Sequence, residues 1–580
     1  MKRHNISFII FAALLAMTSC SKDFLQRPPK GSLNESTLGS AEGAELLCTA
    51  AYGALHSTNA DQWFMTFSTG GANGWLYSDV RSDIAYKGGG GIADCSNFHA
   101  MEVFDGVYPQ HEHINGKWFN LYCAVQRAQS ALRVLNSIPE DDWSERNVRI
   151  GEMKFLRAMY FFDLQRIFNR IPYFDENVEI GDYVNISNVE YTRDELLGLI
   201  AEDFASAASL LPDVQKDKGR ATRYAALAME AKVNLYRAYR QGDDYSVTEI
   251  VPELLEKVVE LCGKIEGKYS LLPDFQQLDQ IEYDNGAESL FEIQFSVDDG
   301  TELNRTSWMY ALCSPCAAQY AGCGFFQPSQ SLVNSYRTGV DGLPMPDNFN
   351  DVDIMTREDG MNNNVDPRLD FVVGRPDVRW KTYTDAPYAE NWVRDATTYG
   401  KYSCKRHLIS PEDPRMWNLG MCDLNWKLIR YADVLLWKAE ALIELGRQDD
   451  AVSLINEVRR RARDSRYVTD WNDSSVPAAK YVIDLYRPGE NCTWTQEYAR
   501  KALRMERKLE LAMEGERFFD LVRWGVAADV MNAYFEKESH LRPYMGDAKF
   551  THGKDEYLPI PSAQIELSHD LYQQNPRYNN

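Results

Sequence analysis

The chain has 580 residues, of which 44% are hydrophobic and 25% are charged, and these globular proportions exclude wholesale disorder. Its 85 acidic and 62 basic residues give a formal net charge of −23, which excludes an unspecific nucleic-acid binder, because such a protein needs a basic face. Beyond the N-terminus, no segment approaches the ~18 consecutive apolar residues of a membrane-spanning helix.

The first twenty residues have the features of a lipoprotein signal. A short basic segment precedes an apolar run from Ile6 to Met17, which is too short to span a bilayer. Small residues follow and lead directly to Cys20, as in a bacterial lipobox. We therefore expect a signal peptide over 1–19 and lipidation of Cys20, with an ordinary secretory signal as the alternative. The polar, turn-rich residues 20–40 are expected to form a lipidated tether.

Two kinds of segment then alternate along the chain. Small residues predict a helix at 41–56, and the first irregular region follows at 57–115, where glycines break any helix among aromatic residues. Amphipathic periodicity predicts the next helices at 117–136, 147–169, 192–211, 220–240 and 251–263. Thr192 and Glu195 predict a capping box for the third of these helices.

Residues 427–463 fit a tetratricopeptide-like helical hairpin. That repeat places a small residue, a glycine, an alanine and an apolar residue at fixed intervals, and Ala439, Gly446, Ala451 and Ile455 match them. The sequence therefore predicts a mostly α protein in which helical hairpins stack into a superhelix. The second irregular region, 296–425, interrupts the helices, and the repeat helices of 427–535 end in a helical stretch at 497–535.

The charged residues of the sequence contain no recognisable catalytic motif. The densest carboxylates, from Glu506 to Asp520, alternate with arginines at helical spacing, which favours an ion-pair lattice over a catalytic pair. His111 and His113 are too weak a pattern for a metal site, and the CxxC of Cys313 and Cys316 lacks the second pair that zinc requires. We expect a disulfide or small buried thiols there, no metal, no cofactor and no enzymatic activity.

Aromatic loops suggest a binding function. A pyranose has an apolar face that stacks on Trp or Tyr, while Asp and Arg nearby bond its hydroxyls. The candidate ligand-binding residues are Trp75, Tyr77, Asp79, Arg81, Asp83, Trp308 and Tyr310. Any of these aromatics could instead pack a loop onto the helices, and Arg81 or Asp83 could pin the loop through a salt bridge. Trp380, Trp392 and Trp417 are the next candidates.

Several segments, in one consistent order, resemble the SusD/RagB family of outer-membrane lipoproteins. The matching segments are 20–25, 151–158 with 171–172, 219–221, 325–329, 366–369, 429–434 with 439–441, 456–459 with 461–462, 506–517 with Asp520 to Arg523, 558–561 and 574–576. The resemblance implies a mostly α body with four tetratricopeptide-like hairpins. It divides the chain into an N-terminal SusD-like helical-repeat region, 41–265, and a SusD/RagB C-terminal region, 266–580.

The resemblance also implies a function. A SusD-like protein captures oligosaccharide at the surface of a Gram-negative cell and acts as the lid of a SusC-like TonB-dependent barrel, held to the outer membrane by its lipid anchor. The RagB-like members serve peptide import, so a peptide-capture lipoprotein is the first alternative. A surface glycosidase and a scaffold that binds only protein are the others.

Replacing Cys20 with alanine should release the protein from membranes, because an acyl anchor is the membrane attachment that the sequence predicts. Fractionation of cells that express the variant measures this directly. Intact-mass analysis of the native protein should find acyl chains on Cys20, and a mass without them would contradict the anchor.

Overall fold

The computed structural model describes residues 39–56, 74–300, 306, 308–317, 319–381 and 387–578. Cys20, the signal peptide, nearly all of the tether and residues 57–73 of the first irregular region therefore lie outside the described residues. Within the described ranges, none of the helices combines the length and the hydropathy needed to cross a membrane.

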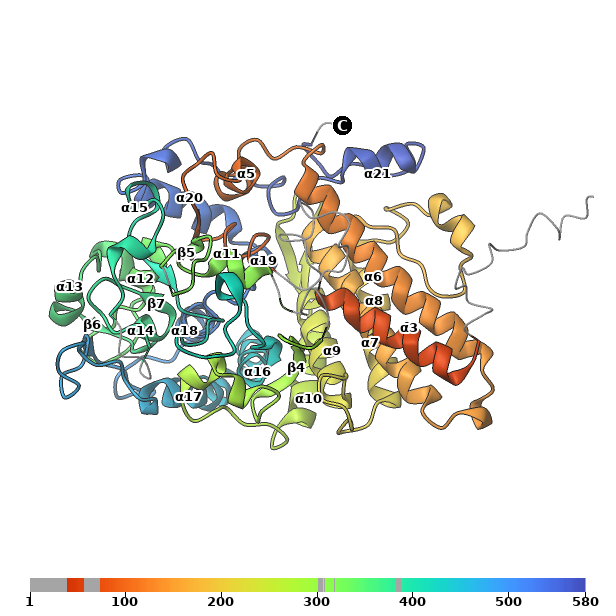
Figure 1. The fold of residues 1–580 in the computed structure, drawn as a ribbon, viewed down its shortest axis with the longest axis horizontal. Coiled ribbons are helices and arrows are strands. Elements are labelled where there is room, and N and C mark those ends of the chain that lie inside the picture. Colours follow the sequence, from red (N-terminus) through yellow and green to blue (C-terminus); the bar gives the residue numbers. More distant parts are fainter. Residues whose placement is uncertain are drawn as a thin grey trace, which may run out of the picture.

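A row of long helices forms one half of the molecule (Figure 1). Its helices are α3 (Ala41–Gly53), α6 (Glu112–Ser137), α7 (Arg146–Phe168), α8 (Arg193–Leu210), α9 (Arg223–Ala238) and α10 (Pro252–Ile265). From α6 to α10 each helix packs on the next, and α3 lies against α6 and α7. All of the helices predicted from periodicity are confirmed, and the Thr192–Glu195 capping box begins α8.

The helical row continues past a long interruption in the sequence. α10 packs directly on α16 (Tyr431–Glu444), although more than a hundred and fifty residues separate them, and α16 forms a hairpin with α17 (Gln448–Asp464). Gly446 makes the turn of this hairpin in the left-handed region, with a φ of +76°. The predicted tetratricopeptide-like spacing is therefore confirmed at this position, and Ala439, Ala451 and Ile455 are all fully buried.

The helical stretch predicted at 497–535 consists of three helices, α18 (Gln496–Glu510), α19 (Arg517–Arg523) and α20 (Ala527–Glu538). The break before α19 contains Gly515, whose φ is +85°. A Cβ atom at Gly515 would lie 3.3 Å from the Cα atom of Gly74, so the backbone of the first irregular region passes directly over this turn.

The two irregular regions contain short elements and are joined to each other. Their helices are α5 (Ser96–Val103), α11 (Trp308–Cys313), α12 (Gln330–Ser335), α13 (Arg357–Asn362), α14 (Arg368–Val372) and α15 (Ala396–Tyr399), and α21 (Ser562–Leu567) lies near the C-terminus. Strand β1 (Ala85–Gly88) pairs antiparallel with β5 (Phe325–Pro328), with Tyr86 opposite Gln327. This pairing brings the first irregular region against the second.

The other strands among the described residues also form two-stranded sheets. These are β2 (Tyr239–Gln241) with β3 (Val247–Ile250), β4 (Ser289–Ile293) with β9 (Trp426–Arg430), and β7 (Val373–Gly374) with β8 (Ser403–Cys404), all antiparallel, and β6 (Asn364–Val365) parallel to β10 (Lys480–Tyr481). One continuous hydrophobic cluster extends from Ala44 to Ile565 and includes both the helical row and the irregular regions.

Cys313 and Cys316 are both free thiols, so the alternative of a disulfide between them is wrong.

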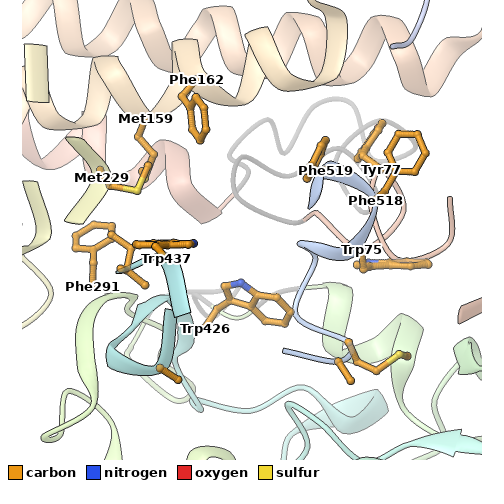
Figure 2. Packing of buried hydrophobic residues seen from close by; sticks show 14 of the residues in the cluster. Trp75, Tyr77, Met159, Phe162, Met229, Phe291, Trp426, Trp437, Phe518 and Phe519 are labelled. Atoms are coloured by element: carbon orange, nitrogen blue, oxygen red, sulfur yellow. The ribbon is translucent and has the colours of Figure 1, made fainter. Parts of the chain in front are cut away.

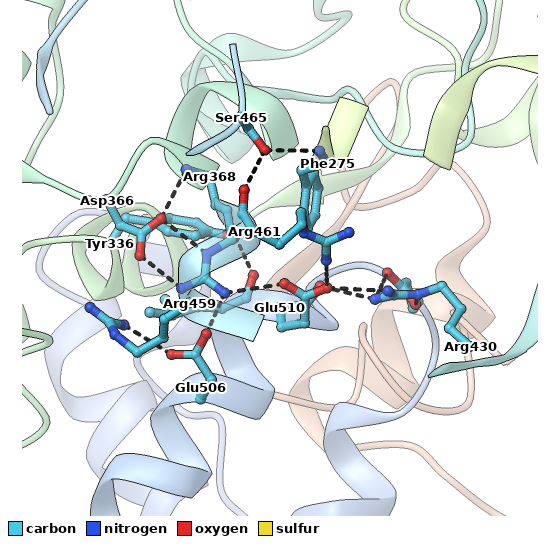
Figure 3. Close-up of polar contacts among 12 residues, drawn as sticks. Phe275, Tyr336, Asp366, Arg368, Arg430, Arg459, Arg461, Ser465, Glu506 and Glu510 are labelled. Atoms are coloured by element: carbon cyan, nitrogen blue, oxygen red, sulfur yellow. Dashed lines mark hydrogen bonds and ion pairs between the residues drawn. The ribbon is translucent and has the colours of Figure 1, made fainter. Parts of the chain in front are cut away.

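A buried cluster of arginines and carboxylates joins the helical row to the second irregular region (Figure 3). Glu510 of α18 lies at its centre and accepts from Arg368 of α14 at 3.2 Å, from Arg430 at the end of β9 at 3.1 Å, and from Arg461 of α17. The remaining ion pairs of the cluster are Arg368 with Asp366 and Glu506, Arg459 with Glu506, Arg430 with Glu288 and Glu514, Arg461 with Glu288, and Arg406 with Glu514 and Asp279.

The ion-pair lattice predicted for this helix is thus confirmed, but its partners come from other elements. Burial alone would raise the pKa of Glu510, yet the guanidinium groups of Arg461, Arg430 and Arg368 outweigh it and hold that pKa below its ordinary value. The carboxylate is therefore charged, fully buried and shared among three cations. Such a group specifies where each of its partners must lie.

Replacing Glu510 with glutamine should lower the free energy of unfolding by about 3 to 5 kcal/mol, because it leaves buried guanidinium groups without their anion. Urea denaturation measures the loss. Glu497→Gln is the matched control, since Glu497 belongs to the same helix with a side chain that is 79% exposed, and it should change stability by no more than about 0.5 kcal/mol. Equal stability of the two variants would contradict a structural role for Glu510.

Candidate ligand-binding site

The structure places the two aromatic candidates of the first irregular region in the interior. Trp75 is 1% exposed and its ring centroid lies 4.9 Å from that of Phe326, while Tyr77 is fully buried and donates to the carbonyl of His113 at 3.1 Å. Both belong to the buried hydrophobic cluster shown in Figure 2. A sugar cannot stack on a ring without an exposed face, so these residues serve the packing of the loop, the alternative that the sequence left open.

The three charged candidates of the same segment hold it against the C-terminal part of the chain. Asp79 accepts from the backbone of Gly515 at 2.8 Å, and burial raises the pKa of Asp79 to about 8. Arg81 donates to the carbonyl of Asp555 at 2.7 Å. Asp83 forms ion pairs with Lys508 and Arg517, both at 2.8 Å. Pinning of the loop by Asp83, which was the alternative to ligand contact, is therefore what the structure shows.

The candidates of the second irregular region differ in exposure. Tyr310 is fully buried and its hydroxyl donates to the carbonyl of Leu424, whereas Trp308, at the start of α11, is half-buried. Trp380 and Trp392 are buried as well, and the ring of Trp380 stacks on Tyr388 with a centroid distance of 5.7 Å. These aromatics form the core of the second irregular region rather than its surface.

Trp417 is the candidate that reaches the surface, with 39% of it exposed. It immediately precedes the short 3-10 helix η8 (Asn418–Gly420), and η8 packs on α11, which begins at Trp308. Gly420 permits this approach, because its φ is +79° and a Cβ atom there would collide with the hydroxyl of Ser314 at the end of α11. We call the set formed by Trp417, Trp308, Asp413, Arg415 and Asp423 the tryptophan surface.

A small separate core supports the loop that carries Trp417. Ile409, Cys422 and Leu424 are buried together, and the partly buried Met416 and Ile281 pack against them. The backbone N–H of Trp417 donates to the carbonyl of Met421 at 2.6 Å, which closes the loop on itself. An exposed tryptophan on a loop with its own core keeps its position without burying its ring, so it is available to a ligand.

Charged groups surround Trp417 on this loop. Arg415 donates to Asp413 at 2.9 Å and to Glu282 at 2.6 Å, and the hydrogen bonds from Arg415 hold the pKa of Asp413 below its ordinary value. Asp423 has a buried carboxylate oxygen, Oδ1, that accepts no hydrogen bond from any described residue, and burial raises the pKa of its carboxyl. The sequence contained no signal for Asp413 or Asp423, because their relevance depends on the exposure of Trp417.

The histidines proposed as a weak metal motif lie at the start of α6. His111 and His113 are buried, and the ring of His113 packs on Phe98 at a centroid distance of 4.9 Å. Burial lowers the pKa of His113 to about 4, so the ring is neutral near pH 7. In the part of the chain that the structure describes, no three His, Cys, Asp or Glu side chains gather as metal ligands do.

Comparison with known families identifies the chain. A family model described as the SusD family matches residues 287–578, and a second model, described as starch-binding and associating with the outer membrane, matches residues 82–235. Since the first model alone covers half of the chain, the protein belongs to the SusD family. Its mostly helical fold with long irregular regions agrees with that assignment.

Similar proteins extend along nearly the whole chain. SusD-like protein P38 of Formosa agariphila is 24% identical over 542 residues, which are 91% of this chain and 93% of that protein. SusD-like protein P2 of the same organism is 24% identical over 594 residues and covers both chains completely.

Among solved structures, a laminarin-binding SusD-like protein has a TM-score of 0.66 at 21% identity and covers 93% of this chain and 100% of its own. The surface glycan-binding protein A of Bacteroides thetaiotaomicron, solved in complex with laminarihexaose, has a TM-score of 0.61 at 20% identity and covers 92% of this chain and 99% of its own. At these identities the two structures establish a shared fold.

Proposed function

We propose that this protein is a surface-exposed, glycan-binding lipoprotein that captures an oligosaccharide on the tryptophan surface. The observation that carries the proposal is the exposed ring of Trp417, held by a loop with its own core that packs on α11, the helix that begins at the half-buried Trp308. Membership of the SusD family supports it, as does the similar fold of proteins described as binding laminarin or laminarihexaose.

The chemistry of this surface suits a neutral sugar. The apolar face of a pyranose stacks on an indole ring, and carboxylates accept hydrogen bonds from the hydroxyls at its rim. The half-buried Asp413 and Asp423 supply acceptors from the same loop. Arg415 can donate to a ring or hydroxyl oxygen from the same loop.

Binding without hydrolysis is the activity we propose. A retaining glycosidase places two carboxyl groups about 5 Å apart across a cleft that its substrate can enter. Of the densest carboxylates, Glu506 and Glu510 are instead fully buried, the side chain of Glu514 is only 6% exposed, and all three are paired with arginines. They have no access to a sugar.

Capture at the cell surface completes the proposed role. Cys20 would carry the lipid anchor in the outer membrane, and the protein would act as the lid of a SusC-like TonB-dependent barrel. The match to a family model described as associating with the outer membrane supports this location. An anchor that confines both partners to one membrane raises their effective concentration, so a modest contact area can keep them together.

Replacing Trp417 with alanine should weaken binding of the preferred oligosaccharide about tenfold or more, because a stacked aromatic contributes on the order of 1–3 kcal/mol. The ligand is first selected by screening the purified protein against a polysaccharide panel and a peptide pool, and its affinity is then measured by calorimetry. Trp471→Ala is the matched control, since Trp471 is also 39% exposed but lies on a different loop, and it should keep wild-type affinity.

Three results would count against the proposal. Unchanged affinity of Trp417→Ala would place the site elsewhere, and binding from the peptide pool alone would favour the RagB-like alternative. Release of sugar from a polymer by the purified protein would indicate a glycosidase.

The protein should co-purify with a TonB-dependent barrel after gentle detergent extraction, because a lid must bury a broad face against its transporter. Affinity purification of the native, anchored protein followed by mass spectrometry measures this. The Cys20→Ala variant is the control and should recover less barrel, since it loses confinement to the membrane. Repeated recovery of the native protein alone, under conditions that preserve comparable complexes, would contradict the lid role.

A further inference from the structure

A pocket lies among the C-terminal helices, and none of its lining residues belongs to the tryptophan surface. It has a volume of about 620 Å³ and opens between α18, α19, α20 and the turn at 346–351. Phe349, Leu521 and Trp524 contribute apolar walls. This volume falls within the range of pockets that bind small molecules, about 300–1,000 Å³.

One wall of the pocket is a row of cations on α18. Lys501, Arg504 and Lys508 follow one another at spacings of three and four residues, so they share a face of the helix, and all three line the pocket. Like charges at these spacings repel each other and destabilise a helix by a few tenths of a kcal/mol per pair. In a chain with a net charge of −23, such a row is a marked local reversal of sign.

Four carboxylates, those of Asp83, Asp347, Asp351 and Asp529, line the pocket with five cations, which are the row on α18 together with Arg517 and Lys537. Lys501 pairs with Asp347 at 2.9 Å near the rim. Deeper in the pocket, Lys508 and Arg517 both pair with the single carboxylate of Asp83, each at 2.8 Å, so two cations share one anion. The lining as a whole therefore keeps one excess positive charge.

Arg504 makes no hydrogen bond or ion pair with any residue that the structure describes. Its guanidinium lies over the ring of Trp524, 4.8 Å from the centroid, and the indole N–H of Trp524 donates to Glu440 at 2.9 Å. The ring is thus fixed, and it orients the guanidinium through a cation–π contact. Burial lowers the pKa of Arg504, but an arginine stays protonated in proteins. Its N–H groups are free to donate to an oxyanion that lies in the plane of the guanidinium group.

We infer that this pocket binds an anionic sugar, with Arg504 holding the oxyanion and the apolar walls holding the ring. A carboxylate or a sulfate ester presents two oxygens to the guanidinium fork, which is the geometry that a bidentate contact requires. The half-buried side chains of Phe349, Val526 and Val530, which also line the pocket, give a pyranose an apolar surface to pack on. The pocket and the tryptophan surface share no residue, so this inference does not depend on the proposed function.

The inference is tested by calorimetry on the purified full-length protein with three probes. Trigalacturonate carries carboxylates, galactose 6-sulfate carries a sulfate ester, and galactobiose is neutral. We expect at least one of the two anionic probes to bind at least tenfold more tightly than galactobiose, and the tighter of the two identifies the oxyanion. Raising the salt concentration should weaken that binding.

Arg504→Gln should weaken binding of the anionic probe at least tenfold, while Arg504→Lys, which keeps the charge but loses the fork, should fall between that variant and the wild type. Arg460→Gln is the matched control, since it removes one exposed arginine from the neighbouring α17 outside the pocket and should leave the affinity unchanged. Trp417→Ala should also keep this affinity, which separates the two sites.

Three outcomes would overturn the inference. These are binding of neither anionic probe, equal affinity for galactobiose, and equal affinity of Arg504→Gln and the wild type. Melting temperatures of the variants establish that each is folded. If Arg504→Gln does not fold, an affinity of Arg504→Lys equal to that of the wild type would overturn it instead.

Discussion

The buried cluster centred on Glu510 is the constraint on which the rest of the structure depends. Each of its guanidinium groups has lost its water, and it is stabilised only where carboxylates lie at bonding distance. Arg368 comes from α14, Arg430 from the end of β9, and Arg461 from α17, and all three bond to one carboxylate of α18. A shift of any of these elements would leave a buried charge unpaired, so the cluster fixes the second irregular region on the helical row.

Because this cluster fixes the second irregular region, the loops of that region can pack as tightly as a hydrophobic core although they contain little regular structure. Aromatic side chains fill them, as in the stack of Trp380 on Tyr388, and the pairing of β1 with β5 joins the two regions across 240 residues of sequence. Trp75, Trp380 and Trp392 are used in this packing. Trp417 is different because its loop rests on a core of its own, formed around Cys422 and Leu424, and does not require the indole ring to be buried.

The arginines show the same contrast as the tryptophans, between side chains that are committed to the interior and one that is not. The protein is acidic overall, yet most of its buried arginines are committed to specific carboxylates. Arg504 lacks such a partner among the described residues and faces a pocket. The tryptophan surface offers carboxylates beside an indole, while the pocket offers a guanidinium beside one. The two sites therefore suit sugars of different charge.

Local features of the sequence determined the helices. The capping box at Thr192 and the spacing from Ala439 to Ile455 are short-range patterns, because a helix is specified by residues within a few turns. The alternating charges from Glu506 to Asp520 also predicted a lattice. They did not predict that Arg368 and Arg430 would complete it, since those partners lie 80 to 142 residues away from Glu510.

The exposure of Trp417 was decided by tertiary structure alone. Trp75 and Trp417 look alike in the sequence, each an aromatic residue in an irregular segment beside Asp and Arg. Trp75 is buried because Phe326, 251 residues further on, packs against its ring, and because α18 and α19 supply the cations that bind Asp83 nearby. Nothing comparable covers Trp417 among the described residues. Exposure depends on which distant segment folds over a side chain, and no local pattern contains that information.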